Sequence, residues 1–114
     1  MKPNNRAEER IPSILTINLK YNDRIFSGMT QNISKNGIYI EAIEMNSSKN
    51  RELSIMVAAE KSLFQLKGEI IWTQPLSCKS SEKSLTGIGI KLSEVSPGYL
   101  NYVEYLKYRN RNNH

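Results

Sequence analysis

Two short polar motifs near the start of the chain contain residue types that could bind an anionic nucleotide. Arg6 and Arg10 lie four residues apart, and Asn32, Ser34 and Gly37 form the pattern Asn-x-Ser-x-x-Gly. The arginine guanidinium is a planar fork of donors that suits phosphate oxygens and the O6 and N7 acceptors of guanine. Asparagine and serine add short polar groups, and glycine allows a close backbone approach or a positive φ. These residue types suit recognition of guanine and phosphate.

Each motif taken alone also has a simpler explanation. The two arginines flank Glu8 and Glu9, and such a charged segment is often only solvated surface. The second motif could be a hairpin turn whose polar side chains bond to nearby backbone groups. The order of the motifs and the 22 positions from Arg10 to Asn32, enough for a strand, a turn and a second strand, favour one shared site. The two glutamates should weaken anion binding there unless they face solvent or pair with a cation.

Composition limits the class of protein. With 39% hydrophobic and 24% charged residues in 114 positions, the chain fits one compact domain. The net charge of +5 favours anionic partners of any kind without choosing among them. The longest apolar run, 55–59, is far shorter than a membrane-spanning helix of about 20 residues, and no signal peptide is evident. We expect a cytoplasmic protein without a membrane span.

Residues suited to metal binding or catalysis are scarce. Cys78 is the only cysteine, and His114 is both the only histidine and the last residue. A zinc site or a histidine-based catalytic set is therefore not expected. The glutamates of the predicted strands and loops have no paired base or nucleophile nearby in the sequence. We expect neither enzymatic activity nor a cofactor.

The pattern of apolar residues is mostly that of β-strands. From Leu15 to Tyr21 apolar and polar residues alternate, which is typical of a half-buried strand. Five further strands are predicted at about 24–31, 38–42, 53–57, 64–72 and 88–92, and Ser96-Pro97 predicts a helix start. Short connections favour a six-stranded antiparallel β-barrel or sandwich with a C-terminal α-helix. We expect one domain over 1–114, with a mobile N-terminal arm at 1–12, the barrel at 13–93 and the helix at 96–109.

Two residues near the end of the longest predicted strand lead to specific expectations. Trp72 continues the alternation with Ile70, so we predict that it lies in the core or at the barrel rim rather than forming a base-stacking platform. Pro75 lacks a backbone N–H and is predicted to end the strand.

The paired motifs give the chain a resemblance to the PilZ domain family, bacterial receptors for the second messenger cyclic di-GMP. Arg6 and Arg10 match the family's RxxxR motif, and Asn32, Ser34 and Gly37 match its [D/N]xSxxG motif. The resemblance implies that the arginines contact phosphates and guanine edges, that Asn32 and Ser34 hydrogen-bond around a guanine, and that Gly37 keeps the turn tight beneath the ligand.

The resemblance extends to the fold. Residues 68–72 (Gly-Glu-Ile-Ile-Trp) and 87–92 (Gly-Ile-Gly-Ile-Lys-Leu) are similar to the family's last two strands. They imply a PilZ-like split barrel, mainly β, with a C-terminal helix. Many members carry another arginine immediately before the first motif, where this chain has Asn5, and this difference slightly favours one bound ligand molecule over a stacked pair.

Three functions remain open from the sequence. The first is a cyclic di-GMP receptor whose arm closes around the ligand and signals to a partner protein by its changed conformation. The second is a degenerate PilZ-like adaptor that makes protein contacts without binding nucleotide, for which Glu8 and Glu9 are the only indication. The third is a small β-barrel that binds single-stranded nucleic acid. It is the least favoured, because clustered surface aromatics on strands are missing.

Overall fold

The computed structural model describes residues 10–21, 24–43, 52–76 and 85–112, with side chains through residue 110. Its elements in chain order are β1 (Ile11–Pro12), β2 (Thr16–Tyr21), β3 (Arg24–Ile33), β4 (Gly37–Ile43), β5 (Glu52–Ala59), β6 (Ser62–Leu76), β7 (Leu85–Glu94) and α1 (Pro97–Asn112). Within these ranges, no helix combines the length and the apolar character needed to cross a membrane.

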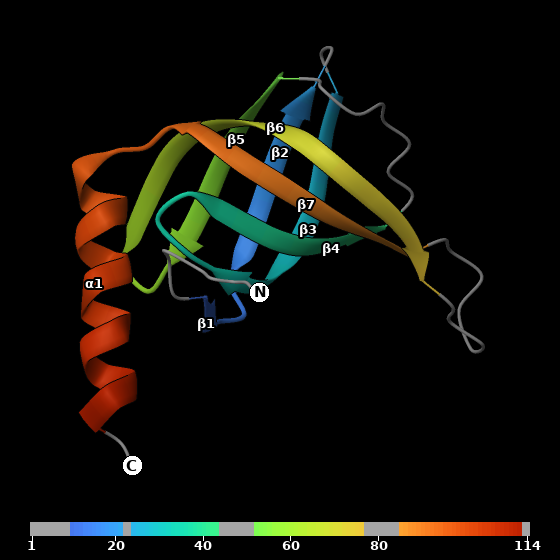
Figure 1. Cartoon of the computed structure of the whole chain (residues 1–114). Coiled ribbons are helices and arrows are strands. Elements are labelled where there is room, and N and C mark those ends of the chain that lie inside the picture. The colour runs from blue at the N-terminus through green and yellow to red at the C-terminus, as the bar shows by residue number, and fades with distance from the viewer. Residues whose placement is uncertain (1–9, 22–23, 44–51, 77–84, 113–114) are drawn as a thin grey trace.

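Strands β2 to β7 form the closed six-stranded antiparallel barrel that the alternation predicts (Figure 1). The hydrogen-bonded order is β3-β2-β5-β6-β7-β4, and a β3–β4 pairing joins the two ends of that order. Closure pairs most strand edges within the barrel. The short strand β1, which the alternation does not predict, adds to β3, where Ile11 pairs with Ile33 and Pro12 with Asn32. The remainder of the expected arm, residues 1–9, lies outside the described residues.

Alternating residues of every strand fill the barrel interior. In β2, Ile17 and Leu19 are fully buried while Thr16, Asn18 and Lys20 are exposed. The buried hydrophobic set comprises Ile11, Ile17, Leu19, Ile33, Ile38, Ile40, Ala42, Leu53, Ile55, Val57, Ala59, Phe64, Leu66, Ile70, Ile88, Ile90, Leu92, Tyr99 and Val103. Burial of each large aliphatic side chain contributes about 1.5–3 kcal/mol to stability. The interior is therefore a packed core, as expected for a small barrel.

Helix α1 begins where the sequence predicts and lies along one side of the barrel (Figure 1). The backbone N–H of Tyr99 donates to the Ser96 side-chain oxygen at 3.3 Å, which caps the first turn. Tyr99 and Val103 are fully buried, and Leu106 is partly buried against the core. The apolar stripe thus holds the first half of the helix, which continues to Asn112.

The structure corrects two expectations for β6. Pro75 does not end the strand, because it pairs with Thr86 of β7 and the strand reaches Leu76. The pairing of β6 with β5 stops at Glu69, so among the described strands residues 70–76 pair only with β7, a setting in which proline is tolerated. Trp72 does not continue the inward face of Ile70, because the β6–β7 register shifts between these two residues. Trp72 is half-buried on the outer surface instead.

Candidate functional site

The turn between β3 and β4 contains two of the predicted site residues, Ser34 and Gly37. The Ser34 N–H donates to the Gly37 carbonyl at 2.9 Å, and the Gly37 N–H donates to Ser34 Oγ at 3.1 Å. The Ser34 hydroxyl also donates to the Gly37 carbonyl at 3.2 Å. Only 1% of Ser34 is exposed. Its described contacts therefore hold the turn closed, and direct contact with a ligand stays a prediction.

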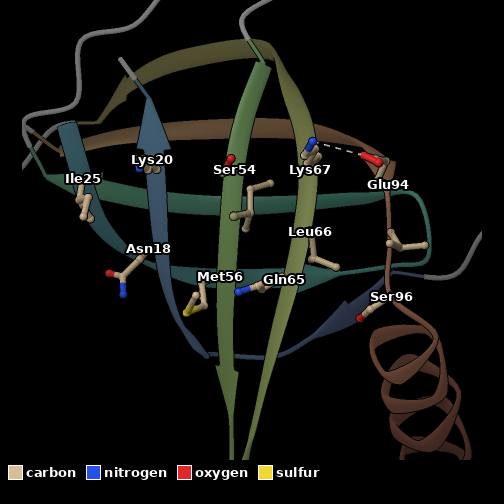
Figure 2. Close-up of a pocket in the computed structure, with 12 residues that line it drawn as sticks. Asn18, Lys20, Ile25, Ser54, Met56, Gln65, Leu66, Lys67, Glu94 and Ser96 are labelled. Atoms are coloured by element: carbon tan, nitrogen blue, oxygen red, sulfur yellow. Dashed lines mark ion pairs between the residues drawn. The ribbon is translucent and has the colours of Figure 1, made fainter. Parts of the chain in front are cut away.

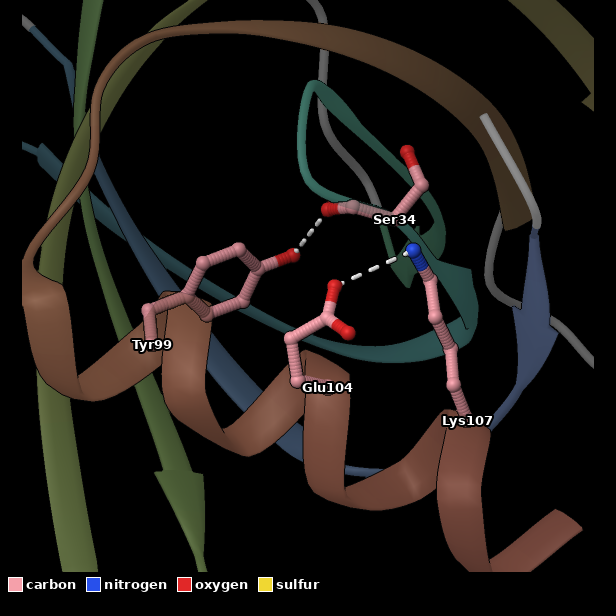
Figure 3. Close-up of polar contacts among 4 residues, drawn as sticks. All are labelled: Ser34, Tyr99, Glu104 and Lys107. Atoms are coloured by element: carbon pink, nitrogen blue, oxygen red, sulfur yellow. Dashed lines mark hydrogen bonds and ion pairs between the residues drawn. The ribbon is translucent and has the colours of Figure 1, made fainter. Parts of the chain in front are cut away.

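Two backbone carbonyls of this turn are held from other parts of the chain. The Leu92 N–H donates to the Asn36 carbonyl at 2.8 Å. The Tyr99 hydroxyl donates to the Ser34 carbonyl at 2.7 Å (Figure 3). Strand β7 and helix α1 thus both fix the turn, while the side chains of Lys35 and Asn36 are exposed.

Gly37 is required for space rather than for its backbone conformation. No glycine in the described part of the chain has a positive φ. A Cβ on Gly37 would lie 3.1 Å from the Ile90 carbonyl oxygen, closer than most real contacts of this kind. Of the two glycine properties weighed from the sequence, the close approach of the turn to β7 is the one that applies.

The side-chain oxygen of Asn32 is a hydrogen-bond acceptor that no described residue uses. Asn32 is half-buried in β3, between Pro12 of β1 and Tyr39 of β4 in the strand ladder. Its Oδ1 is buried and accepts no hydrogen bond from the described residues. A buried polar atom without a partner costs about 1–3 kcal/mol, so a donor that reached this oxygen would be strongly favoured.

Arg10 lies beside the same turn. It immediately precedes β1, and because Ile11 pairs with Ile33, continuation of the antiparallel register places Arg10 opposite Ser34. Ile11 is buried and Arg10 is exposed. The structure thus brings Arg10 and the Asn32-to-Gly37 motif together, 22 positions apart in the sequence. Arg6, Glu8 and Glu9 lie outside the described residues.

An aromatic pair that was not predicted from the sequence extends this surface. The rings of Tyr39 and Trp72 stack with centroids 5.3 Å apart and an interplanar angle of 26°. Both pair with Gly89 in the ladder, and a Cβ there would lie 2.2 Å from the Trp72 ring nitrogen. Since Asn32 pairs with Tyr39, one outer row runs from Asn32 through the two rings. In the sequence, Gly87 and Gly89 alternate with isoleucines that prove to be buried. This pattern could have indicated that large side chains from neighbouring strands cover the outer face of β7.

A surface hollow of about 610 Å³ lies elsewhere, on the outer faces of β2, β5 and β6 (Figure 2). Its lining is mostly apolar surface, with Asn18, Lys20 and Gln65 as polar side chains on three strands, and Lys67 is ion-paired with Glu94 at 3.6 Å. None of the described predicted residues lines it. The described residues also contain no group of three or more histidine, cysteine, aspartate or glutamate side chains placed to hold a metal ion.

Comparison with known proteins gives a family match and a set of similar solved structures. The model of the PilZ domain family matches residues 4–106. Among solved structures, the chain is similar to the Bacillus subtilis inhibitor of motility MotI/DgrA, with a TM-score of 0.76 and 16% identity over all of this chain and 55% of that one. The PilZ domain of Escherichia coli YcgR with c-di-GMP gives a TM-score of 0.68 and 14% identity over 95% of both chains.

A third similar structure is Borreliella burgdorferi PlzA in complex with c-di-GMP, with a TM-score of 0.64 and 14% identity over 93% of this chain and 53% of that one. The present chain spans about half the length of the MotI/DgrA and PlzA chains. At these identities the likeness to solved structures shows a shared fold. No curated protein matches.

Proposed function

Because the chain belongs to the PilZ domain family, we propose that it is a receptor or adaptor that binds cyclic di-GMP. The proposed site comprises Arg6, Arg10, Asn32, Ser34 and Gly37, and the proposed signal is a rearrangement of the N-terminal segment that a partner protein recognises. Support from outside the chain is the shared fold with structures of YcgR and PlzA that contain c-di-GMP. No catalytic role is proposed.

The observation that carries this proposal is the buried Oδ1 of Asn32, which accepts no hydrogen bond from the described residues. Guanine carries N–H donors on its Watson–Crick and minor-groove edges, and an amide oxygen is a suitable acceptor for them. The same side-chain amide can donate to a guanine acceptor. A guanine edge would therefore satisfy a group that the described residues leave without a donor.

Arg10 supplies the charge that the ligand's phosphates need. It is exposed, and it lies opposite Ser34 by the register of β1 on β3. A charge-assisted hydrogen bond contributes about 1.5–3 kcal/mol. A few such bonds, less the cost of ordering the N-terminal segment, are consistent with a dissociation constant near micromolar.

Ser34 and Gly37 shape the site in this proposal. Ser34 Oγ is already engaged with Gly37, so a direct bond to ligand requires that contact to loosen. Gly37 lets the turn lie against the Ile90 carbonyl. Both residues therefore position Asn32 by fixing the chain between β3 and β4.

Titration calorimetry with cyclic di-GMP tests the proposal. Arg10→Ala should weaken binding by about 10- to 100-fold, the equivalent of one charged hydrogen bond. Arg24→Ala is the matched control, because Arg24 is an exposed arginine at the opposite end of β3 and should change affinity less than twofold. Absence of binding by the parent chain at tens of micromolar would exclude the receptor function. Equal binding of linear GMP would show that the two phosphates are not recognised together.

A further inference from the structure

Tyr99 connects helix α1 to the candidate site through its buried hydroxyl. Its side chain is fully buried, and its hydroxyl donates to the Ser34 carbonyl at 2.7 Å across 65 positions of sequence (Figure 3). The neighbouring N–H and Oγ of Ser34 are the groups that close the turn on Gly37. The hydroxyl of Tyr99 therefore acts on the same residue that sets the shape of the turn.

Tyr99 is itself held firmly. Its backbone N–H is bonded to the Ser96 side chain, and its ring meets Phe64 edge-on with centroids 6.1 Å apart. A Cβ on Gly98 would lie 3.3 Å from the Phe64 ring, so the first helical turn sits close against β6. In contrast, Tyr105 and Tyr108 on the second half of α1 are 48% and 70% exposed.

We propose that Tyr99 is a positioning residue for the turn that carries the ligand site, and that seating of α1 on the barrel is energetically coupled to the shape of that turn. The part of this inference that concerns ligand affinity rests on the proposed function. The part that concerns the turn stands on the hydrogen bond alone. The Tyr99–Ser34 hydrogen bond would then transmit a change at the ligand site to helix α1, in addition to any movement of the N-terminal segment.

The coupling can be measured as an effect of ligand on helix α1 or as an effect of a helix-binding partner on ligand affinity. A ligand that holds Asn32 and its turn in place favours the seated helix, because the Ser34 carbonyl then stays within reach of Tyr99. By reciprocity, a partner that draws α1 off the barrel weakens ligand binding by the same factor. The exposed second half of α1 is the part of the helix that such a partner can reach.

Tyr99→Phe removes the hydroxyl and keeps the ring, and Tyr105→Phe makes the same change on the exposed part of the helix. Amide hydrogen exchange without ligand should speed up by about fivefold at Ser34 and Gly37 in Tyr99→Phe, the equivalent of one neutral hydrogen bond. Exchange at the core residues Ile17 and Leu19 should change less than at the turn. Tyr105→Phe should leave the turn unchanged. Unaltered exchange at Ser34 and Gly37 in a folded Tyr99→Phe protein would overturn the inference.

Calorimetry on the same variants tests the ligand part. Cyclic di-GMP affinity should fall by about fivefold in Tyr99→Phe and stay constant in Tyr105→Phe. If the parent chain binds no cyclic di-GMP, the proposed function fails while the exchange data still decide the positioning role. If Tyr99→Phe does not fold, exchange in the parent chain decides: added ligand must slow amides 100–103 of α1, and an absence of slowing counts against the coupling.

Discussion

Two turns of the barrel join antiparallel strands in opposite ways. At 34–37, between β3 and β4, Ser34 is buried and distant residues hold the turn's carbonyls. At the β5–β6 hairpin, the two residues between Ala59 and Ser62 are Glu60 and Lys61, and both are exposed. The first turn is held by distant parts of the fold, whereas the two central residues of the second face solvent.

The use of glycine sharpens this contrast. Gly37 has no positive φ and is needed because the turn lies against β7. Glu60 has φ of 54°, a left-handed conformation that favours glycine in a two-residue hairpin, yet a charged residue occupies it. Glycine is thus present where packing against β7 requires it, at Gly37, and absent where the backbone conformation favours it, at Glu60. The turn with the more extensive hydrogen bonds and the tighter packing is the one beside the candidate site.

The largest expected effect is that of Ser34→Ala. Loss of Oγ removes the acceptor of the Gly37 N–H and a donor to the Gly37 carbonyl, so the free energy of unfolding should fall by about 2 kcal/mol. Urea denaturation measures this change. Ser27→Ala is the control, since the Ser27 bond to Asn18 is exposed and should contribute less than about 0.5 kcal/mol. Equal effects of the two substitutions would remove the distinction between a buried and an exposed serine contact.

Gly37→Ala should have the next largest effect. The added Cβ would lie 3.1 Å from the Ile90 oxygen, so the turn or β7 must shift. We expect a loss of about 1 kcal/mol in urea denaturation, the lower end of the cost of overpacking. An unchanged unfolding midpoint would show that the turn can move away from β7 freely.

Glu60→Gly should change stability in the opposite direction. Glycine relieves the left-handed strain of about 1–2 kcal/mol and loses part of that gain through its greater freedom in the unfolded chain. The free energy of unfolding should rise by about 0.5 kcal/mol. Lys61→Gly is the matched control, because Lys61 has no positive φ and should yield no gain. A loss of stability in Glu60→Gly would mean that the carboxylate makes a contact worth more than the strain.

The smallest expected effect concerns pH at the second turn. Burial raises the pKa of the Tyr102 hydroxyl, and the Glu60 carboxylate raises it further. The folded state then holds this proton more tightly than the unfolded state, whose pKa is about 10, so the stability due to it is present below that pH and is lost as pH rises toward the folded pKa. Chemical denaturation at about pH 9 and about pH 11 should therefore show a smaller loss in Tyr102→Phe than in the parent. An equal loss would exclude this linkage.

Much of the fold could be predicted because strand alternation is a local property. Ile17 and Leu19 face the core as expected, and the Ser96-Pro97 helix start is confirmed. The error at Trp72 has a different origin, since a register shift between β6 and β7 changes which face a residue occupies. Such a shift is a relation between two strands, and a pattern along one strand does not contain it.

The sequence by itself determined the barrel class, the capped helix and the two polar motifs, because these depend on residue types at short spacing. The tertiary structure decided how they meet. Arg10 precedes β1, which pairs with the end of β3, and Asn32 Oδ1 has no donor among the described residues and lies in line with a stacked aromatic pair. A tyrosine on α1 is bonded to the motif's own carbonyl. The Tyr99 contact spans 65 positions, and only the pairing register and the seating of the helix bring its two ends within hydrogen-bond distance.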